Sequence, residues 1–161
     1  MTLTPDKLSV EILIECNGWA AQPAAKDAID RAVMEAAEVT KTNHGEVAIV
    51  LTDDAAIRDL NRTWRGIDAP TNVLSFPAKQ GPGAPARLGD IVIPYETVAR
   101  EAIAQEKPFA HHLMHLAVHG FLHLLGHDHE TDGDADVMEG LERAILARLH
   151  VPDPYATRDA T

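Results

Sequence analysis

HHLMHLAVHGFLHLLGHDH, residues 111–129, contains the end of a helix and the turn that follows it. Pro108, just before this stretch, suits the first turn of a helix. Gly126 is a natural C-terminal cap, because glycine adopts the left-handed backbone that commonly ends a helix. The sequence therefore predicts a helix from about Pro108 to about Leu125 and a sharp turn after it.

Seven of the nine histidines lie in this stretch, and three of them have the spacing of a metal site. His119 and His123 are four residues apart, so on a helix both imidazoles point to the same side. The turn at Gly126 allows His129 to approach them. Three neutral imidazoles suit Zn²⁺ and leave a fourth position for water, which is typical of catalytic zinc. We therefore predict one zinc ion per chain, with His119, His123 and His129 as its ligands.

Other residues of the stretch limit this interpretation. His115 extends the four-residue spacing backwards, but each such step drifts by roughly 40° around a helix, so we expect it to pack or to support a ligand. Asp128 can accept a hydrogen bond from a ligand imidazole or shape the turn, and both interpretations stay open. The spacing also matches the zinc motif of one metalloprotease class, which needs Glu directly after the first His as general base. Gly120 occupies that position, which argues against proteolysis.

The rest of the chain predicts interleaved strands and helices. Apolar runs and alternation predict strands at residues 8–15, 46–52, 72–76 and 90–93. Apolar spacing and caps predict helices at residues 24–38, 53–64, 95–106 and 134–149. Glycine and proline predict a mobile loop over residues 78–88. The fold class expected is α+β, with a single mixed sheet of about four strands packed with five to six helices.

Composition narrows the class of protein. The 161 residues are 45% hydrophobic and 24% charged, which suits one compact domain, residues 1–151, with a polar C-terminal tail, residues 152–161, that we expect to fray. The lone Cys16 excludes an internal disulfide framework and favours a reducing compartment. No run is long and apolar enough for a membrane span, and the N-terminus lacks the pattern of a secretory signal. We therefore expect a cytoplasmic protein with no membrane partner.

The charge is acidic overall but uneven. Fourteen Lys and Arg against 25 Asp and Glu give a formal net charge of -11, which argues against wholesale coating of nucleic acid. Residues 58–107 nevertheless hold seven of the bases against six acids, so a local cationic face can exist on an acidic body. Residues 127–142 hold seven acids and no base, which we interpret as a solvated surface.

Three blocks of the sequence resemble the YbeY family of bacterial endoribonucleases, which are rRNA maturation factors. They are HGFLHLLGHDH (119–129), LNRTWRGIDAPTNVLSFP (60–77) and LGDIVI (88–93), and the resemblance covers roughly residues 45–149. It implies a small sheet surrounded by helices, with the zinc site at one end of a cleft. It also implies that His119, His123 and His129 are the zinc ligands and that Arg65 is a key arginine. The implied activity is metal-dependent cleavage of single-stranded RNA in processing of the small-subunit 16S rRNA 3′ end and in ribosome quality control.

Phosphodiester cleavage at such a site assigns roles to few residues. Zinc can activate water or polarise a phosphoryl oxygen while the RNA 2′-hydroxyl attacks, so either nucleophile is open. We expect His119 and Arg65 to be catalytic, with the planar guanidinium of Arg65 binding phosphate. Asn72 and Ser75 can line the cleft and bind substrate, although turn capping and strand-edge bonding explain them equally well. With only 4% aromatic residues, we expect contact mainly with phosphates of single-stranded rRNA held in the small ribosomal subunit.

Two alternative functions remain at this point. One is a non-enzymatic ribosome-assembly factor whose zinc is structural, and the other is a zinc hydrolase acting on a peptide or small ester. A structural zinc contributes folding free energy directly, so thermal stability after chelation separates the first alternative from an enzyme.

Overall fold

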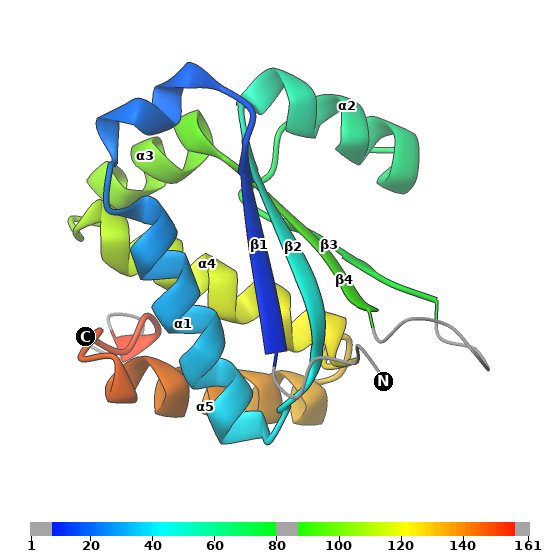
Figure 1. Ribbon diagram of the computed structural model, residues 1–161, viewed down its shortest axis with the longest axis vertical. Coiled ribbons are helices and arrows are strands. Elements are labelled where there is room, and N and C mark those ends of the chain that lie inside the picture. Colours follow the sequence, from blue (N-terminus) through cyan, green and yellow to red (C-terminus); the bar gives the residue numbers. More distant parts are fainter. Residues whose placement is uncertain (1–7, 80–86, 157–161) are drawn as a thin grey trace, which may run out of the picture.

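The computed structural model describes residues 8–79 and 87–156 (Figure 1). Within them lies one four-stranded sheet, in the order β1-β2-β4-β3. Its strands are β1 (Leu8–Ile14), β2 (Gly45–Thr52), β3 (Leu74–Pro77) and β4 (Arg87–Pro94). β1, β2 and β4 run parallel, whereas β3 is antiparallel to β4. The sheet is therefore mixed, as predicted.

Helices follow β1, β2 and β4 along the chain. In the described part of the chain they are α1 (Ala25–Thr40), α2 (Asp54–Arg65), α3 (Tyr95–Ala104), α4 (Phe109–Leu124), α5 (Asp132–Arg148) and a 3-10 helix, η1 (Asn17–Ala21). The α+β prediction with about four strands is confirmed. The side chain of Asp53 accepts a hydrogen bond from the backbone N–H of Ala56 at 2.9 Å, which explains why α2 begins there.

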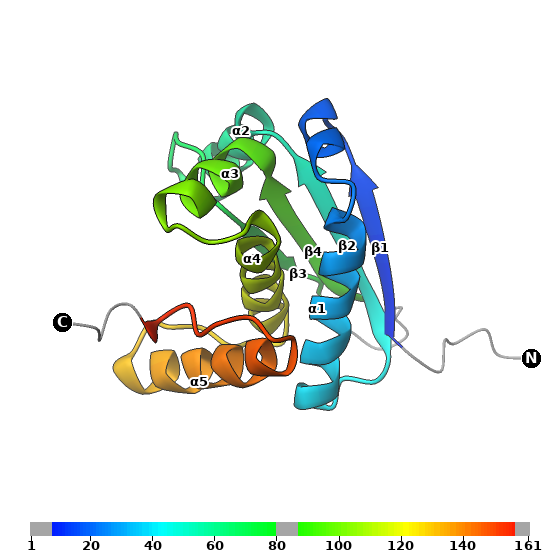
Figure 2. The same ribbon diagram turned by 90° about the vertical axis from the view of Figure 1, so that its left-hand side faces the viewer.

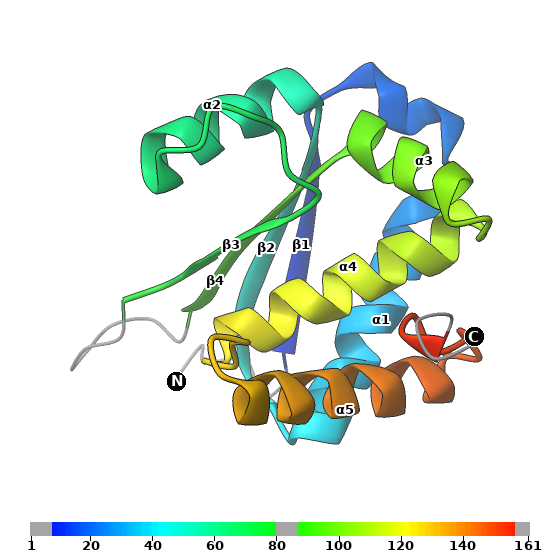
Figure 3. The ribbon, with the colours of Figure 1, turned by 180° about the vertical axis from the view of Figure 1, so that it is seen from behind.

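The two faces of the sheet are covered by different helices. Ile91 and Ile93 of β4 pack in the main core with α1 and α4, whereas Val92 points to the opposite face and packs with Ile57 of α2. Figures 1 and 3 show α2 set apart from α1, α4 and α5. Figure 2 shows α5 lying below α4, with one end beside the lower end of α1. Within the described residues, no helix is long and apolar enough to cross a membrane.

Gly120 allows α4 to approach the sheet closely. A Cβ atom at this position would lie 2.9 Å from Cγ2 of Ile91 and 3.1 Å from Oγ of Ser75. Residue 120 therefore points at β3 and β4, one residue after His119. A glutamate at this position would meet the sheet, so the absence of the metalloprotease base follows from how α4 packs.

The structure changes some boundaries. β4 begins at Arg87, inside the predicted loop, because the register with β2 shifts by one residue next to Gly89, whose φ is 141°. The third strand begins at Leu74 rather than at 72, and η1 was not predicted. The central part of the predicted mobile loop, residues 80–86, lies outside the described residues.

The first part of the expected C-terminal tail makes specific contacts with α5. Asp153 pairs with Arg143 of α5, and it accepts a hydrogen bond from the backbone N–H of Tyr155 at 2.8 Å. Val151, just before the tail, is buried in the main core. The polar composition of the tail did not predict these contacts, because they depend on the side chain of Arg143, which lies on α5 beside the tail. Residues 157–161 lie outside the described residues.

Candidate metal centre

The end of α4 turns the chain back on itself. Gly126 has φ 97°, and the N–H groups of Gly126 and His127 donate to the carbonyls of His123 and Leu122 at 3.0 and 3.1 Å. These bonds satisfy carbonyls that a helix end leaves free. Thr131 then caps α5 by accepting a hydrogen bond at 3.1 Å from a backbone N–H of its first turn. The short connection between the two helices carries the third predicted ligand.

The three predicted ligands come together around one point. The Nε2 atoms of His119 and His123 lie 3.1 Å apart, and the ring of His129 is centred 5.7 and 5.3 Å from theirs. One nitrogen of each ring lies within 4.8 Å of the others. Two imidazoles bound at ~2.1 Å to a tetrahedral zinc ion have their nitrogens ~3.4 Å apart, so the spacing of the rings fits such an ion.

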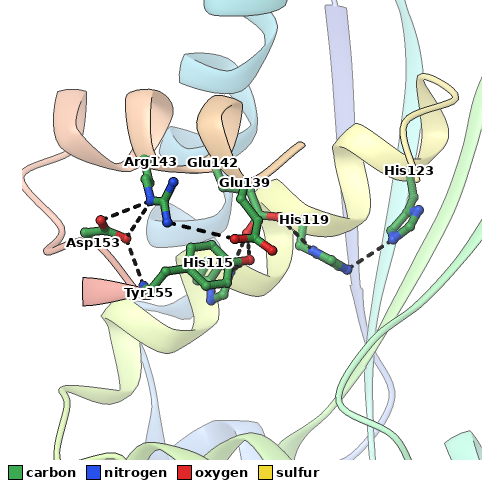
Figure 4. A network of polar contacts seen from close by, with 8 residues as sticks. All are labelled: His115, His119, His123, Glu139, Glu142, Arg143, Asp153 and Tyr155. Atoms are coloured by element: carbon green, nitrogen blue, oxygen red, sulfur yellow. Dashed lines mark hydrogen bonds and ion pairs between the residues drawn. The ribbon is translucent and has the colours of Figure 1, made fainter. Parts of the chain in front are cut away.

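A buried carboxylate lies behind His119 (Figure 4). The side chain of Glu142 is only 1% exposed, and its Oε1 is 3.0 Å from Nδ1 of His119. Its Oε2 is 2.5 Å from Nε2 of His115 and accepts the hydroxyl of Tyr155 at 2.7 Å. Burial raises the pKa of Glu142, but the hydrogen bonds from His115 and His119 outweigh it and lower the pKa from 4.5 to about 2.

This carboxylate determines which nitrogen of His119 carries the proton. An ionised carboxylate only accepts hydrogen bonds, so Nδ1 of His119 donates, and in the neutral ring the lone pair is then on Nε2. That lone pair faces His123 and His129. Burial and the neighbouring imidazoles lower the pKa of His123, which keeps its ring uncharged. The lowered pKa favours the neutral ring of His123, which is the charge state that binds a metal ion.

A second group also meets the distance condition for a metal ion. It consists of His115, His119 and Glu142, whose potential ligand atoms lie within 4.8 Å of one another. It shares His119 with the first group, and its atoms are joined by the hydrogen bonds just described. We therefore interpret it as the support of the first group. His115 has the supporting role expected from its position on the helix.

A pocket of about 800 Å³ extends from His119 along α4. It reaches Lys107 at the start of the helix, and Tyr155 forms part of its wall. Asn72 also lines it, with its side-chain N–H donating to Glu101 at 3.0 Å. The structure thus brings Asn72 and His119 to one pocket, whose lining includes neither His123 nor His129.

Arg65 and Ser75 are not gathered around the histidines. Arg65 is exposed in the last turn of α2, which packs on the other face of the sheet, and it makes no hydrogen bond or ion pair with a described residue. The hydroxyl of Ser75 donates to the carbonyl of Gly120 at 3.1 Å, so it ties β3 to α4. Asp128 accepts the backbone N–H of Glu130 at 3.3 Å, which favours its turn-shaping interpretation. The roles of Arg65 and Ser75 toward RNA stay predictions.

Sequence reasoning missed Glu142 and Tyr155. The acidic run 127–142 was interpreted as a solvated surface, yet Glu142 is fully buried. A signal was present, since Glu142 follows Met138 by four residues and precedes Ile145 and Leu146, all of which are buried. A glutamate on the apolar side of an amphipathic helix needs a buried partner. No such signal marks Tyr155.

Comparison with known proteins gives consistent matches. A family model described as Endoribonuclease YbeY matches residues 14–150. A protein named endoribonuclease YbeY from Bradyrhizobium sp. strain BTAi1 is 57% identical over 159 residues, covering 94% of each chain. One of the same name from Nitrobacter hamburgensis is 57% identical over 94% of this chain and 84% of that protein. The solution structure of TM1509 from Thermotoga maritima shares the fold, with a TM-score of 0.53 and 23% identity over 88% of this chain and 91% of that one.

Proposed function

The chain belongs to the endoribonuclease YbeY family, as its three sequence blocks predicted, and from this membership we propose that it is a zinc-dependent endoribonuclease. Its substrate is single-stranded RNA, and the reaction serves rRNA processing at the 3′ end of the small-subunit 16S rRNA and ribosome quality control in the cytoplasm. The observation that carries the proposal is the group of His119, His123 and His129, which offers three imidazole nitrogens within 4.8 Å of one another, with His119 also lining a pocket.

These three histidines would hold the zinc ion. When bound, it supplies Lewis acidity near neutral pH, either by activating water or by polarising a phosphoryl oxygen. The chain orients the site through Glu142, which holds the proton of His119 at Nδ1 and keeps Nε2 free. Glu142 itself is a poor candidate for the general base, because its side chain is 1% exposed and both oxygens already accept hydrogen bonds.

The pocket beside His119 would hold the RNA. Asn72 offers a polar contact there, and the guanidinium of Arg65 would bind a phosphate further along the strand. Its exposure and its lack of an ion pair among the described residues leave its donors available. Acidic side chains elsewhere would repel free RNA, so we expect weak, salt-sensitive binding of isolated RNA and recruitment through the ribosome.

The test is cleavage of a 5′-labelled single-stranded RNA, with the metal content of each preparation measured. His119→Ala is compared with His44→Ala, which removes an exposed histidine away from α4. Arg65→Ala is compared with Arg31→Ala on α1. We expect His119→Ala to lose both metal and cleavage, and Arg65→Ala to keep the metal but lose cleavage. Both control variants should behave as wild type.

Other results would redirect the proposal. If all variants cut alike, the activity is a contaminant, and an assembly factor with structural zinc becomes the better interpretation. If Arg65→Ala cuts RNA as wild type does, the phosphate role of Arg65 is wrong while the histidine site stands. Hydrolysis of a nitrophenyl ester that survives Arg65→Ala, without RNA cleavage, would favour a zinc hydrolase of another class.

A further inference from the structure

The segment that follows α5 folds back against α4 and brings one side chain to the site. Tyr155 is half-buried, and the guanidinium of Arg143 lies 5.3 Å from the centre of its ring. Asp153 accepts the backbone N–H of Tyr155 at 2.8 Å and pairs with the same arginine at 3.1 Å. These contacts fix where the phenol lies (Figure 4).

The phenol is directed at the carboxylate behind the histidines. Its hydroxyl donates to Oε2 of Glu142 at 2.7 Å and lies 3.4 Å from Nε2 of His115. The ring meets that of His115 edge-on, with centres 5.7 Å apart and planes at 85°. Its hydrogen bond to Glu142 connects Tyr155 to His119, because the other oxygen of the same carboxylate holds Nδ1 of His119.

The two oxygens of Glu142 accept hydrogen bonds from different side chains. Oε1 holds Nδ1 of His119 at 3.0 Å, and Oε2 takes the donors from His115 and Tyr155. Rotation of the carboxylate would exchange the two oxygens and break these bonds. Two donors at Oε2 oppose that rotation, so Oε1 stays in line with His119. Partners of this kind commonly change metal affinity when removed, although they never touch the ion.

We propose that Tyr155 is a positioning residue of the histidine site. Its hydroxyl fixes the carboxylate of Glu142, which in turn fixes the ring orientation and the Nδ1–H tautomer of His119. The inference rests on the proposed function, in which His119 is a metal ligand. It assigns a role in the site to a segment whose composition predicted only a polar tail.

The experiment uses the full chain and the variant Tyr155→Phe, which removes the hydroxyl and keeps the ring. Tyr95→Phe is the matched control, because Tyr95 packs against Trp19 and Phe109 and its hydroxyl makes no hydrogen bond with a described residue. Zn²⁺ affinity is measured by competition with a chromogenic chelator. The tautomer of His119 is read in metal-free protein from nitrogen NMR shifts of the imidazole, at a pH where the ring is neutral. Circular dichroism checks that each variant folds.

We expect Tyr155→Phe to weaken Zn²⁺ binding by up to about 10-fold, the lower end of the loss for a direct partner of a ligand, and to give a mixture of His119 tautomers. Tyr95→Phe should match wild type in both. In a Glu142→Gln background, the same Tyr155→Phe change should alter affinity by less than about twofold, because the carboxylate that transmits it is gone. An equal loss in both backgrounds would mean that Tyr155 acts by another route.

Wild-type affinity together with a single Nδ1–H tautomer in Tyr155→Phe would overturn the inference. Failure of the proposed function is a separate result. If wild-type protein binds no Zn²⁺ or does not cut RNA, the enzyme proposal fails, while the tautomer comparison in metal-free protein still tests Tyr155. If Tyr155→Phe does not fold, a wild-type tautomer of His119 in Arg143→Ala, which loosens the phenol, would contradict the proposal.

Discussion

Replacing Gly120 by alanine should destabilise the protein, although alanine is the better helix former. The substitution gains about 1 kcal/mol of helix propensity in α4. It also places a methyl group 2.9 Å from Cγ2 of Ile91, a branch on a fully buried strand residue that has little room to move. Overpacking of this kind costs about 1–3 kcal/mol. The expected net change is therefore from near zero to about 2 kcal/mol less stable.

Gly140→Ala is the matched control for this prediction. Gly140 is exposed in α5, and a Cβ atom there would meet nothing within 4 Å, so alanine should stabilise by about 0.5–1 kcal/mol. The propensity term cancels between the two variants, and the remaining difference of about 1–3 kcal/mol measures the packing against β4. In a chain of this size each kcal/mol shifts Tm by about 2–4 °C.

Thermal melts followed by circular dichroism, in excess chelator so that metal binding does not contribute, give both values. Gly120→Ala should melt below wild type or level with it, and Gly140→Ala above it. If Gly120→Ala were as stable as Gly140→Ala, α4 would not press on the sheet at this residue. The explanation of why position 120 cannot carry a general base would then be wrong.

Removing the metal with a chelator should abolish RNA cleavage but lower Tm by only a few degrees, because the buried core holds α4 and α5 together. Unfolding of the protein in chelator would instead indicate a structural zinc. Asp54→Asn should destabilise at pH 7, measured by urea unfolding. Burial raises the pKa of Asp54, but hydrogen bonds from Thr97 and Arg100 prevail and hold the pKa below the usual 3.8. The stability that these bonds contribute is therefore present above about pH 4 and is lost as the pH falls through the lower pKa of the folded state. An equal loss of stability in Asp54→Asn at pH 7 and in strong acid would contradict this. Trp19→Phe should lower the free energy of unfolding in urea by about 1–3 kcal/mol, because the buried carbonyl of Thr52 loses the indole N–H that donates to it at 2.9 Å. A loss below about 0.5 kcal/mol would show that water replaces that donor.

The local part of the site was predictable from the sequence. His119 and His123 follow the period of one helix, and the cap at Gly126 determines how the chain reverses to bring His129 back. Each of these inferences depends on residues less than about four turns of helix apart. The element order and the mixed sheet were predictable for a similar reason, since apolar periodicity is a local signal.

The rest depended on packing between distant elements. Glu142 reaches His119 only because α5 crosses α4, and the sequence does not specify that crossing. Arg65 was expected to bind phosphate, and where its side chain lies depends on which face of the sheet α2 covers. The β4 boundary moved because a bulge at Gly89 let the ladder continue through a residue that was interpreted as loop. These are tertiary effects that override local propensity.

The three proposed ligands are not held equally firmly. His119 is adjacent to the residue at which α4 presses on the sheet, and a buried carboxylate holds its ring, so its nitrogen cannot move unless the core moves with it. His129 is exposed and lies on a short turn outside the helices. An ion that needs longer bonds would therefore be accommodated by displacement of His129. If the three histidines bind an ion as proposed, we expect the same asymmetry to set the order of metal exchange, with His129 releasing a departing ion first and closing on an arriving one last.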